Sequence, residues 1–535
     1  MKYYIYRNNT IENLFSNIQA EYSGYDDISE VPDNCDAFIW FYQLPLRFKD
    51  ELAADEIINY LENIKFILQR IPSSKPFFLF SLSKIFYNNC EIGDFRVSNS
   101  LSHFNSEIVK IVSKNTNVKV IDFNKFALVN NYKQLVDWKY YYISGMMINP
   151  RLASAFQEWF RNELNAINSI RKKCLILDLD NTLWGGILGE DGVDGIKIGG
   201  SYPGNAFYDF QKAILQLKKS GIMLAVCSKN NEKDVLEAWK ENENILINNK
   251  VLVNYKINWK NKAENISDII TELNIGADSV VFIDDNPTER EIVKQFIPQI
   301  EVPEFPKQAY DLTDFIMEIA RKYFQIYKIT NEDKSKTLQY QANTSRNLLK
   351  KDFTKFDEYI KSLEIQLVIK PASKITIPRI AQMTQKTNQF NLTTKRYNES
   401  DILNLISNNY KIFTLEVSDK FGEQGITGLI ILQSCKINQS ISIQSLLLSC
   451  RILGKKIEFE FVKFILSKMK KEGYKKVVAN YIESDRNDQV KDFYDKLGFT
   501  CLKETQNHKL EKEYCYYLKN KDIVLSENYK LDKNE

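Results

Sequence analysis

Short apolar runs alternate with amphipathic stretches in the N-terminal part of the chain. Three runs have the length of buried strands: DAFIWFY (36–42), KPFFLFSL (75–82) and NVKVIDF (117–123). Between the first two, residues 50–71 place apolar side chains at helical spacing. Strands that alternate with helices predict an α/β domain with a parallel sheet over residues 1–165.

The same rhythm returns further along the chain. KCLILDLD, IMLAVCSK and SVVFIDD are the expected central strands of a second α/β domain over residues 168–305, with helices at 205–220 and 262–274. Residues 306–355 are rich in Lys, Gln, Glu and aromatic side chains. We expect them to form a helical connector.

The pattern changes to mixed strands and helices after this connector. The runs EIQLVIK, KIFTLEV, GITGLIILQS and SIQSLLLSC come before an amphipathic stretch, EFEFVKFILSKMKKEG. This order predicts an α+β domain over residues 356–520. Residues 521–535 are polar and are expected to be a flexible tail. The expected fold class is therefore α/β multidomain.

Composition narrows the range of partners. Of 535 residues, 44% are hydrophobic, which is enough for several cores and excludes a disordered protein. The 72 basic and 69 acidic residues nearly cancel, so no global field favours nucleic acid or a membrane surface. No apolar stretch approaches the roughly 20 residues of a membrane span, and the N-terminus lacks a signal-peptide layout. We expect a cytoplasmic protein.

Histidine and cysteine usage narrows the chemistry. Only two histidines are present, His103 and His508. A Ser-His-Asp triad or a histidine metal site would have to use one of these two. The eight cysteines lack metal-ligand spacing and are scattered over a long chain, which argues against a zinc site and a disulfide framework. Carboxylate or thiol chemistry is the expectation.

Chemically active side chains follow the predicted strands of the second domain. They are Asp178 and Asp180, Ser228, Lys262, and Asp284 with Asp285. The carboxyl ends of parallel strands meet at one edge of a sheet, so these groups are expected to converge. Carboxylates with an ammonium and a hydroxyl suit Mg²⁺ and a phosphoryl group. One such motif alone is usually a solvated turn or a helix cap, but four in this order favour a site.

The motifs DLDNT, CSKN, NKAEN and IDDNP resemble the four ordered motifs of the haloacid dehalogenase (HAD) phosphatase superfamily. The resemblance implies that Asp178 is the nucleophile and Asp180 the acid/base. It implies phosphate contacts from Ser228, Lys262 and Thr182. The implied Mg²⁺ ligands are Asp178, Asp180 through its carbonyl, Asp284 and Asp285.

The stretch that follows Asp180 bears on substrate size. Only a short glycine-rich segment separates this residue from the helix near Phe207, which is too little for a globular cap domain. We expect an open site, which suits a bulky or protein-tethered substrate.

The α+β domain carries a thiol and a glycine ahead of its amphipathic helix. SLLLSCRILGKK contains Cys450, Arg451 and Gly454, and such a glycine lets amides of a helix N-terminus face a phosphate. With the segment NDQVKDFYDKLGFT, this region is similar to the GNAT acetyltransferase fold, which implies pantetheine contacts at Arg451 and Gly454. RILGKK departs from the usual pattern because it lacks a second small residue. The unusual stretch QMTQKTNQFNLTTKRY (382–397) has a plain interpretation as a helix with a capped end.

Taken together, these motifs look like the FkbH family, in which a HAD subfamily IIIC phosphatase-like domain precedes a GNAT-like domain. The resemblance implies transfer of a glyceryl group from 1,3-bisphosphoglycerate, through an enzyme thiol, to the phosphopantetheine arm of an acyl carrier protein. Attack by Asp178 on the acyl phosphate at phosphorus would release the acyl unit as a free carboxylate, and its activation would be lost. We therefore expect Asp178 to act on the phosphomonoester and a thiol to take the acyl group. Cys450 is preferred to Cys227, whose strand position favours a core role.

The first domain is similar in strand order to SGNH hydrolases, but no GDS block is visible. Tyr140 stands where a DxxH pattern would carry histidine. We expect no esterase activity and a structural or docking role. Two alternatives to the transferase stay open: a Mg²⁺-dependent phosphomonoesterase in polysaccharide or secondary-metabolite biosynthesis, and a non-catalytic assembly protein.

Overall fold

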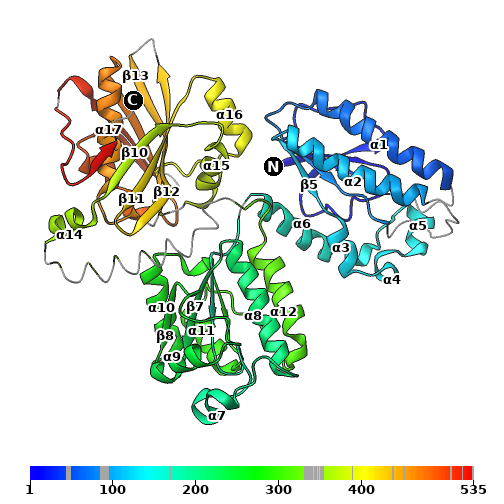
Figure 1. Ribbon diagram of the computed structural model, residues 1–535. Coiled ribbons are helices and arrows are strands. Elements are labelled where there is room, and N and C mark those ends of the chain that lie inside the picture. The colour runs from blue at the N-terminus through cyan, green and yellow to red at the C-terminus, as the bar shows by residue number, and fades with distance from the viewer. Residues whose placement is uncertain are drawn as a thin grey trace. The chain divides into compact units, whose positions relative to one another are not determined.

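Three β-sheets organise the described part of the chain (Figure 1). The computed structural model describes residues 1–43, 50–84, 95–168, 170–329, 355–387, 389–435, 439–449, 452–506, 509–520 and 522–532, together with positions 342, 346, 349 and 353. Two compact units are formed: Met1–Ile167 with Glu399–Asn404, and the remainder. No helix among the described residues is long and apolar enough to cross a membrane.

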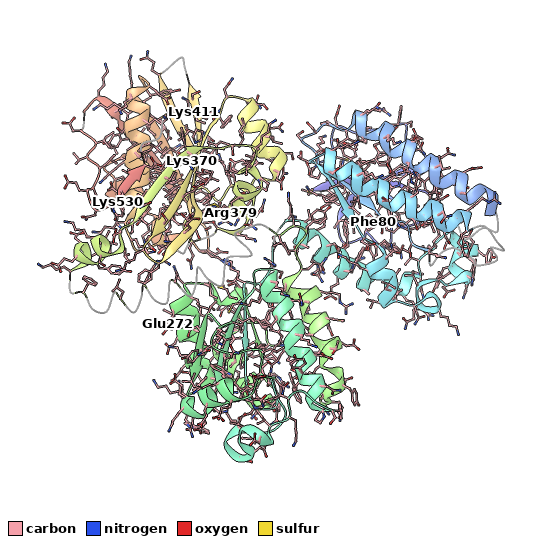
Figure 2. The ribbon with its side chains drawn as sticks, viewed as in Figure 1. Phe80, Glu272, Lys370, Arg379, Lys411 and Lys530 are labelled. Carbon is pink, nitrogen blue, oxygen red and sulfur yellow. The ribbon has the colours of Figure 1, made fainter. Side chains whose placement is uncertain are left out.

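The first sheet is parallel throughout, with the strand order β2-β1-β3-β4-β5. Its strands are β1 (Lys2–Arg7), β2 (Gln19–Tyr25), β3 (Ala37–Phe41), β4 (Phe77–Phe80) and β5 (Val118–Ile121). The inner strands β3 and β4 are buried along their whole length, as expected when helices cover both faces. Phe80, labelled in Figure 2, stacks among Phe15, Phe41 and Phe156 in this core.

Helices surround the first sheet. They are α1 (Asp50–Arg70), α2 (Arg96–Lys114), α3 (Asn124–Val129), α4 (Tyr132–Leu135), α5 (Trp138–Ser144) and α6 (Ala153–Ile167). The helix predicted at 50–71 therefore forms. It does so because apolar side chains recur at helical spacing, and Ile57, Ile64 and Ile67 are buried.

The middle sheet is a four-stranded parallel sheet with the order β8-β7-β6-β9. Its strands are β6 (Cys174–Leu177), β7 (Met223–Ser228), β8 (Asn254–Ile257) and β9 (Val280–Ile283). Its helices are α7 (Leu188–Gly195), α8 (Gly204–Lys219), α9 (Glu232–Glu241), α10 (Lys262–Leu273), α11 (Pro287–Phe296) and α12 (Leu312–Ile319). The strands β6, β7 and β9 and the helices α8 and α10 match the sequence predictions. Most of the predicted connector after residue 329 lies outside the described residues.

The last sheet is mixed, with the order β15-β16-β14-β13-β12-β11-β10-β17. Its strands are β10 (Gln366–Pro371), β11 (Lys411–Asp419), β12 (Gly422–Cys435), β13 (Ser440–Leu448), β14 (Lys476–Ile482), β15 (Thr500–Gln506), β16 (Leu510–Tyr517) and β17 (Lys530–Asp532). β10 to β13 are antiparallel neighbours, whereas β13 and β14 run parallel and are joined through α17 (Ile457–Lys471). The remaining helices are α14 (Phe356–Leu363), α15 (Ile377–Lys386), α16 (Glu399–Ser407) and α18 (Phe493–Lys496).

The polar C-terminal segment differs from its expectation. Residues predicted to be a flexible tail include β17, which pairs with β10 from Gln366↔Lys530 to Val368↔Asp532 (Lys530 and Lys370 are labelled in Figure 2). Tyr529 is buried, and its hydroxyl donates to the Lys455 carbonyl at 2.6 Å. Low hydropathy failed as a signal here because one buried tyrosine and backbone pairing hold the segment in place.

Candidate active site

The parallel register of the middle sheet brings the predicted residues to one edge. β6 and β9 pair up to Leu177↔Ile283, and the Asp178 amide donates to the Ile283 carbonyl at 3.0 Å. Asp178 and Asp284 therefore stand side by side just beyond the two strand ends. Ser228 ends the neighbouring strand β7. The convergence expected from the parallel pattern is what the structure shows.

A buried lysine lies between the two aspartates. Lys262 Nζ is 2.9 Å from Asp178 Oδ2 and 2.6 Å from Asp284 Oδ2. All three residues are at most 5% exposed. The sequence places Lys262 at the start of α10 because Asn261 caps that helix, its side chain accepting from the Ala263 amide at 2.8 Å.

One carboxylate oxygen at this site lacks a hydrogen-bond partner among the described residues. Asp178 Oδ1 is buried and receives no hydrogen bond from the described part of the chain. Burying such an oxygen is costly, so a group that contacts it there would stabilise the arrangement. By contrast, Asp284 Oδ1 accepts from the Asn286 amide at 2.9 Å.

Asp285 completes a set of three carboxylates. Asp178, Asp284 and Asp285 each offer one oxygen within 4.8 Å of the others. Thr182 is fully buried, and its Oγ1 accepts from the Asp285 amide at 3.1 Å and lies 3.4 Å from Asp285 Oδ1. Three ionised carboxylates against one ammonium leave an excess of negative charge. Hard oxygen donors with that excess fit a divalent cation such as Mg²⁺.

The pKa directions describe the same crowded cluster. Burial and the charge of Asp178 raise the pKa of Asp284 to about 7, against the opposing effect of Lys262. Burial also raises the pKa of Asp285. Burial by itself would lower the pKa of Lys262, but Asp178 and Asp284 together raise it above its usual range. A further positive charge would relieve the repulsion between these carboxylates.

Asp180 turns its carboxylate to a different set of partners. Oδ1 accepts from Trp184 Nε1 and from the Leu188 amide, both at 3.0 Å, and Oδ2 accepts from Asn230 Nδ2 at 2.8 Å. Burial raises the pKa of Asp180, while these three donors favour its ionised form. The Asp180 carboxylate is thus held beside the triad of carboxylates and is not one of its three members.

Ser228 and its neighbours form the opposite wall. Ser228 ends β7, which lies on the other side of β6 from β9, and the residue is 1% exposed. The Asn258 amide donates to the Ser228 carbonyl at 3.1 Å, which joins the ends of β7 and β8. Nearby, Trp259 Nε1 donates to Asn231 Oδ1 at 3.0 Å, although the Trp259 ring is largely exposed.

Sequence reasoning missed several residues that hold the site together. Arg290, on α11, donates to the carbonyls of Asp284 at 2.9 Å and Asp285 at 2.7 Å, and it pairs with Glu304. Asn230 and Trp184 fix Asp180, as described above. Asn230 lies inside the CSKN motif and was available as a signal. A single arginine six residues after an aspartate carries no such signal in a sequence.

Of the two candidate thiols, the structure describes Cys227 and not Cys450. Cys227 is fully buried, its Sγ lies 3.7 Å from the Lys262 carbonyl, and burial raises its thiol pKa. This agrees with the expected core role. Cys450 and Arg451 lie outside the described residues. Gly454 is exposed with a φ of +78°, two residues before Lys456, the N-cap of α17.

The equivalent edge of the first sheet carries a serine and an acid without a histidine among its described side chains. Ser81 Oγ donates to Asp122 Oδ1 at 2.8 Å. His103 is exposed on α2, and Tyr140 lies on α5. The expectation that this region has no esterase activity stays a prediction.

Comparison with known proteins adds one informative neighbour. No protein-family model and no curated protein matches the chain. Its structure is similar to the crystal structure of the N-terminal part of protein BF1531 from Bacteroides fragilis, which contains a phosphatase domain complexed with Mg. The two share 25% identity with a TM-score of 0.55, over 61% of this chain and 94% of that one.

Acetyltransferase structures match a smaller share of this chain. The ribosomal-protein-S18-alanine N-acetyltransferase from Escherichia coli covers 30% of this chain and 98% of its own, at 11% identity and a TM-score of 0.24. An N-acetyltransferase from Staphylococcus aureus Mu50 covers 29% of this chain and 99% of its own, at 16% identity and a TM-score of 0.23.

The similarity to the phosphatase-containing structure confirms the α/β multidomain fold class with a HAD-like parallel sheet. It also supports the prediction that the chain is an enzyme. The share of the chain that matches is larger than the middle sheet and its helices, so the likeness is not confined to the carboxylate site.

Proposed function

We propose that the middle sheet carries a Mg²⁺-dependent phosphatase site that acts on a phosphomonoester. The observation that carries this proposal is Asp178, a buried aspartate with one oxygen on Lys262 and the other without a hydrogen-bond partner in the described part of the chain. The Mg in the similar phosphatase-containing structure supports the choice of cation. Asp178, Asp284 and Asp285 would hold it, with Asp180 contributing its carbonyl, and the cation would neutralise charge on the phosphoryl oxygens.

The protein groups divide the reaction between them. Asp178 attacks phosphorus, the bond from phosphorus to the leaving oxygen breaks, and an aspartyl-phosphate forms. Asp180 gives its proton to the leaving oxygen and then takes one from the water that cleaves the aspartyl-phosphate. Lys262, Ser228 and Thr182 hold the phosphoryl oxygens. Lys262 also keeps the aspartates close, because without an ammonium between them their charges would repel each other.

The finer proposal is transfer of a glyceryl group to an acyl carrier protein. The Cys450 thiolate would attack the acyl carbonyl of 1,3-bisphosphoglycerate, the bond to the acyl phosphate would break, and phosphate would leave. The thioester would then pass to the thiol of the phosphopantetheine arm, with Arg451 and Gly454 in contact with that arm. The resemblance to the FkbH family supports this route, and the GNAT-like order of β13, α17 and β14 is compatible with it.

A simpler function competes with this one. The single candidate thiol that the structure describes near the phosphatase site, Cys227, is buried and has a raised pKa, which disfavours it as a nucleophile. This observation removes Cys227 as an acyl acceptor. If Cys450 carries no acyl group either, a plain phosphomonoesterase remains.

Intact-mass spectrometry separates these functions. The full chain is incubated with Mg²⁺ and 1,3-bisphosphoglycerate, then with a pantetheinylated carrier protein, beside the variants Cys450→Ala, Cys227→Ala and Asp178→Asn. We expect a hydroxylamine-labile glyceryl adduct that is absent from Cys450→Ala, retained by Cys227→Ala and chased onto the carrier. Phosphate release without an adduct would leave the plain phosphatase. No phosphate release from the wild-type protein, with any of several phosphomonoesters, would refute both.

A further inference from the structure

The last sheet contains a gap between two parallel strands. β13 and β14 pair only from Ser440↔Lys476 to Ile443↔Ala479, although β13 continues to Leu448 and β14 to Ile482. Beyond the last pair, the backbone groups of each strand that face the other need new partners. An extended chain with amide groups is the natural occupant of such an edge.

The chain itself supplies this occupant. Residues 390–393, here called the gap strand, come from the connection between α15 and α16. The Leu392 amide donates to the Leu446 carbonyl at 3.2 Å, and the Leu448 amide donates to the Phe390 carbonyl at 3.1 Å. On the other side, the Ile482 amide donates to the Leu392 carbonyl at 2.8 Å. The gap strand therefore bridges β13 and β14.

Side chains fix the gap strand in place. Asn391 is fully buried, and its Oδ1 accepts from the Thr394 amide at 2.9 Å. Its carbonyl accepts from Asn487 Nδ2 at 2.9 Å. Thr393 Oγ1 donates to the Gln444 carbonyl at 3.0 Å, and Phe390 packs edge-on against Phe493 at 5.0 Å. These interactions account for much of the unusual 382–397 stretch, which is more than a helix with a capped end.

Acidic side chains and the C-terminal segment lie at the start of α17. A helix N-terminus attracts phosphate groups, but Glu458 and Glu460 stand in the first turn of this one. The C-terminal segment adds two contacts: the Ser526 amide donates to Glu460 Oε2 at 2.7 Å, and Tyr529 donates to the Lys455 carbonyl. Two acidic residues in the first turn therefore make this helix start unfavourable for a pyrophosphate.

We propose that the gap strand and the first turn of α17 exclude free coenzyme A from the last sheet. Coenzyme A joins an extended diamide chain to a pyrophosphate. The gap strand fills the space between β13 and β14 that the first group would need, and the acidic first turn of α17 disfavours the second. The arm of a carrier protein has the same diamide chain, so on this proposal it reaches Cys450 by a path outside the gap. A thioester on the enzyme exchanges with any thiolate that reaches it, so exclusion keeps the acyl group from a diffusing thiol. That consequence rests on the proposed transfer function, whereas the exclusion of coenzyme A does not.

Binding of coenzyme A to the full chain tests the proposal without any turnover. Equilibrium dialysis compares the wild-type protein with Asn391→Ala, which loosens the gap strand, and with Lys395→Ala, an exposed control two residues after it. We expect no saturable binding at millimolar coenzyme A for wild type and Lys395→Ala, and at least tenfold tighter binding for Asn391→Ala. Micromolar binding by wild type would overturn the proposal. So would a folded Asn391→Ala variant that binds no better than wild type.

Hydrogen exchange of the wild-type protein provides a second measurement should Asn391→Ala fail to fold. Peptides that cover residues 390–393 and 444–448 are followed with and without about 5 mM coenzyme A. At this excess, weak binding to the native state would still be visible by mass action. Unchanged protection is the expected result. Faster exchange of the gap strand on addition of coenzyme A would show that the ligand displaces it, which contradicts exclusion.

Discussion

The first and middle sheets place polar side chains at the same kind of edge but satisfy them differently. At the first sheet, Asn8 and Gln43 exchange hydrogen bonds with each other, and Gln43 also contacts Ser81 and Ser83. At the middle sheet, Asp178 beside Lys262 keeps one buried oxygen that no described residue contacts by a hydrogen bond. Parallel strands create the location in both cases. The difference in chemistry comes from ionised groups that the protein leaves incompletely paired.

The largest expected effect is on turnover. Asp178→Asn removes the nucleophile and is expected to lower the phosphatase rate by about a thousandfold or more, because covalent catalysis is lost. Release of phosphate from an aryl phosphate with Mg²⁺ measures it. Ser81→Ala, at the edge of the first sheet, is the matched control and should leave this rate unchanged. A fully active Asp178→Asn variant would remove the distinction between the two edges.

The next effect is on stability. Lys262→Met leaves Asp178 and Asp284 buried without their ammonium, and removing one partner of a buried charge cluster typically costs about 3–5 kcal/mol. Urea denaturation of the metal-free protein measures the change in the free energy of unfolding. Asp122→Asn in the first sheet, which keeps an acceptor for Ser81, should cost about 1 kcal/mol. Equal losses would mean that the two edges have similar electrostatics.

Magnesium provides a smaller, conditional effect. At a hundredfold excess over its Kd, Mg²⁺ should stabilise the native state by about 2.7 kcal/mol. Protons compete for the same oxygens, and the pKa of Asp284 is raised to about 7. Below that pH the carboxyl binds a proton in the folded state, so the stabilisation by Mg²⁺ should be larger at pH 8 than at pH 6.

The sign is opposite for the metal-free protein. Asp284 binds a proton more tightly when folded than when unfolded, so its contribution to stability falls as pH rises from about 4 toward 7. Thermal unfolding at pH 6 and pH 8, with and without Mg²⁺, measures both effects. Asp284→Asn should reduce the dependence on pH and on Mg²⁺ together. An Mg²⁺ shift that survives this substitution unchanged would place the cation elsewhere.

The smallest expected effect is in the first sheet. Gln43→Ala removes the amide that joins β3 to the Ser81 carbonyl and the Ser83 amide, and it should cost about 1–3 kcal/mol while leaving phosphatase turnover unaltered. Urea denaturation measures the loss of stability, and the aryl phosphate assay measures turnover. A loss of turnover in a folded Gln43→Ala protein would link the first sheet to the reaction.

The sequence predicted the location of the site better than its internal contacts. Apolar strands that end in Asp178, Ser228 and Asp284 could be recognised, because a parallel sheet brings such ends together. Of the three donors to Asp180, Asn230 lies in a recognisable motif. The Trp184 indole and the Leu188 amide could not be recognised, because their approach depends on how the segment after β6 folds.

The last sheet shows a second limit of sequence patterns. Four of its strands, β10 to β13, and α17 were anticipated from apolar runs, whereas β14, β15 and β16 were not. The gap strand and β17 were missed as well. Both are short, and both are held by backbone pairing to distant strands rather than by a local apolar period. Residues such as Asn391 and Thr393 are polar yet buried, so hydropathy assigns them to a loop.

The gap strand also has a consequence for how this sheet is assembled. Leu392 pairs with Leu446 and Ile482, which come much later in the chain, so neither pairing is local. Non-local pairings are slow because the entropy of closing long loops opposes them. Until the gap strand docks, β13 and β14 present unsatisfied backbone edges, which are sites of misassociation between molecules. Docking of residues 390–393 covers these edges, because their backbone groups pair with both strands.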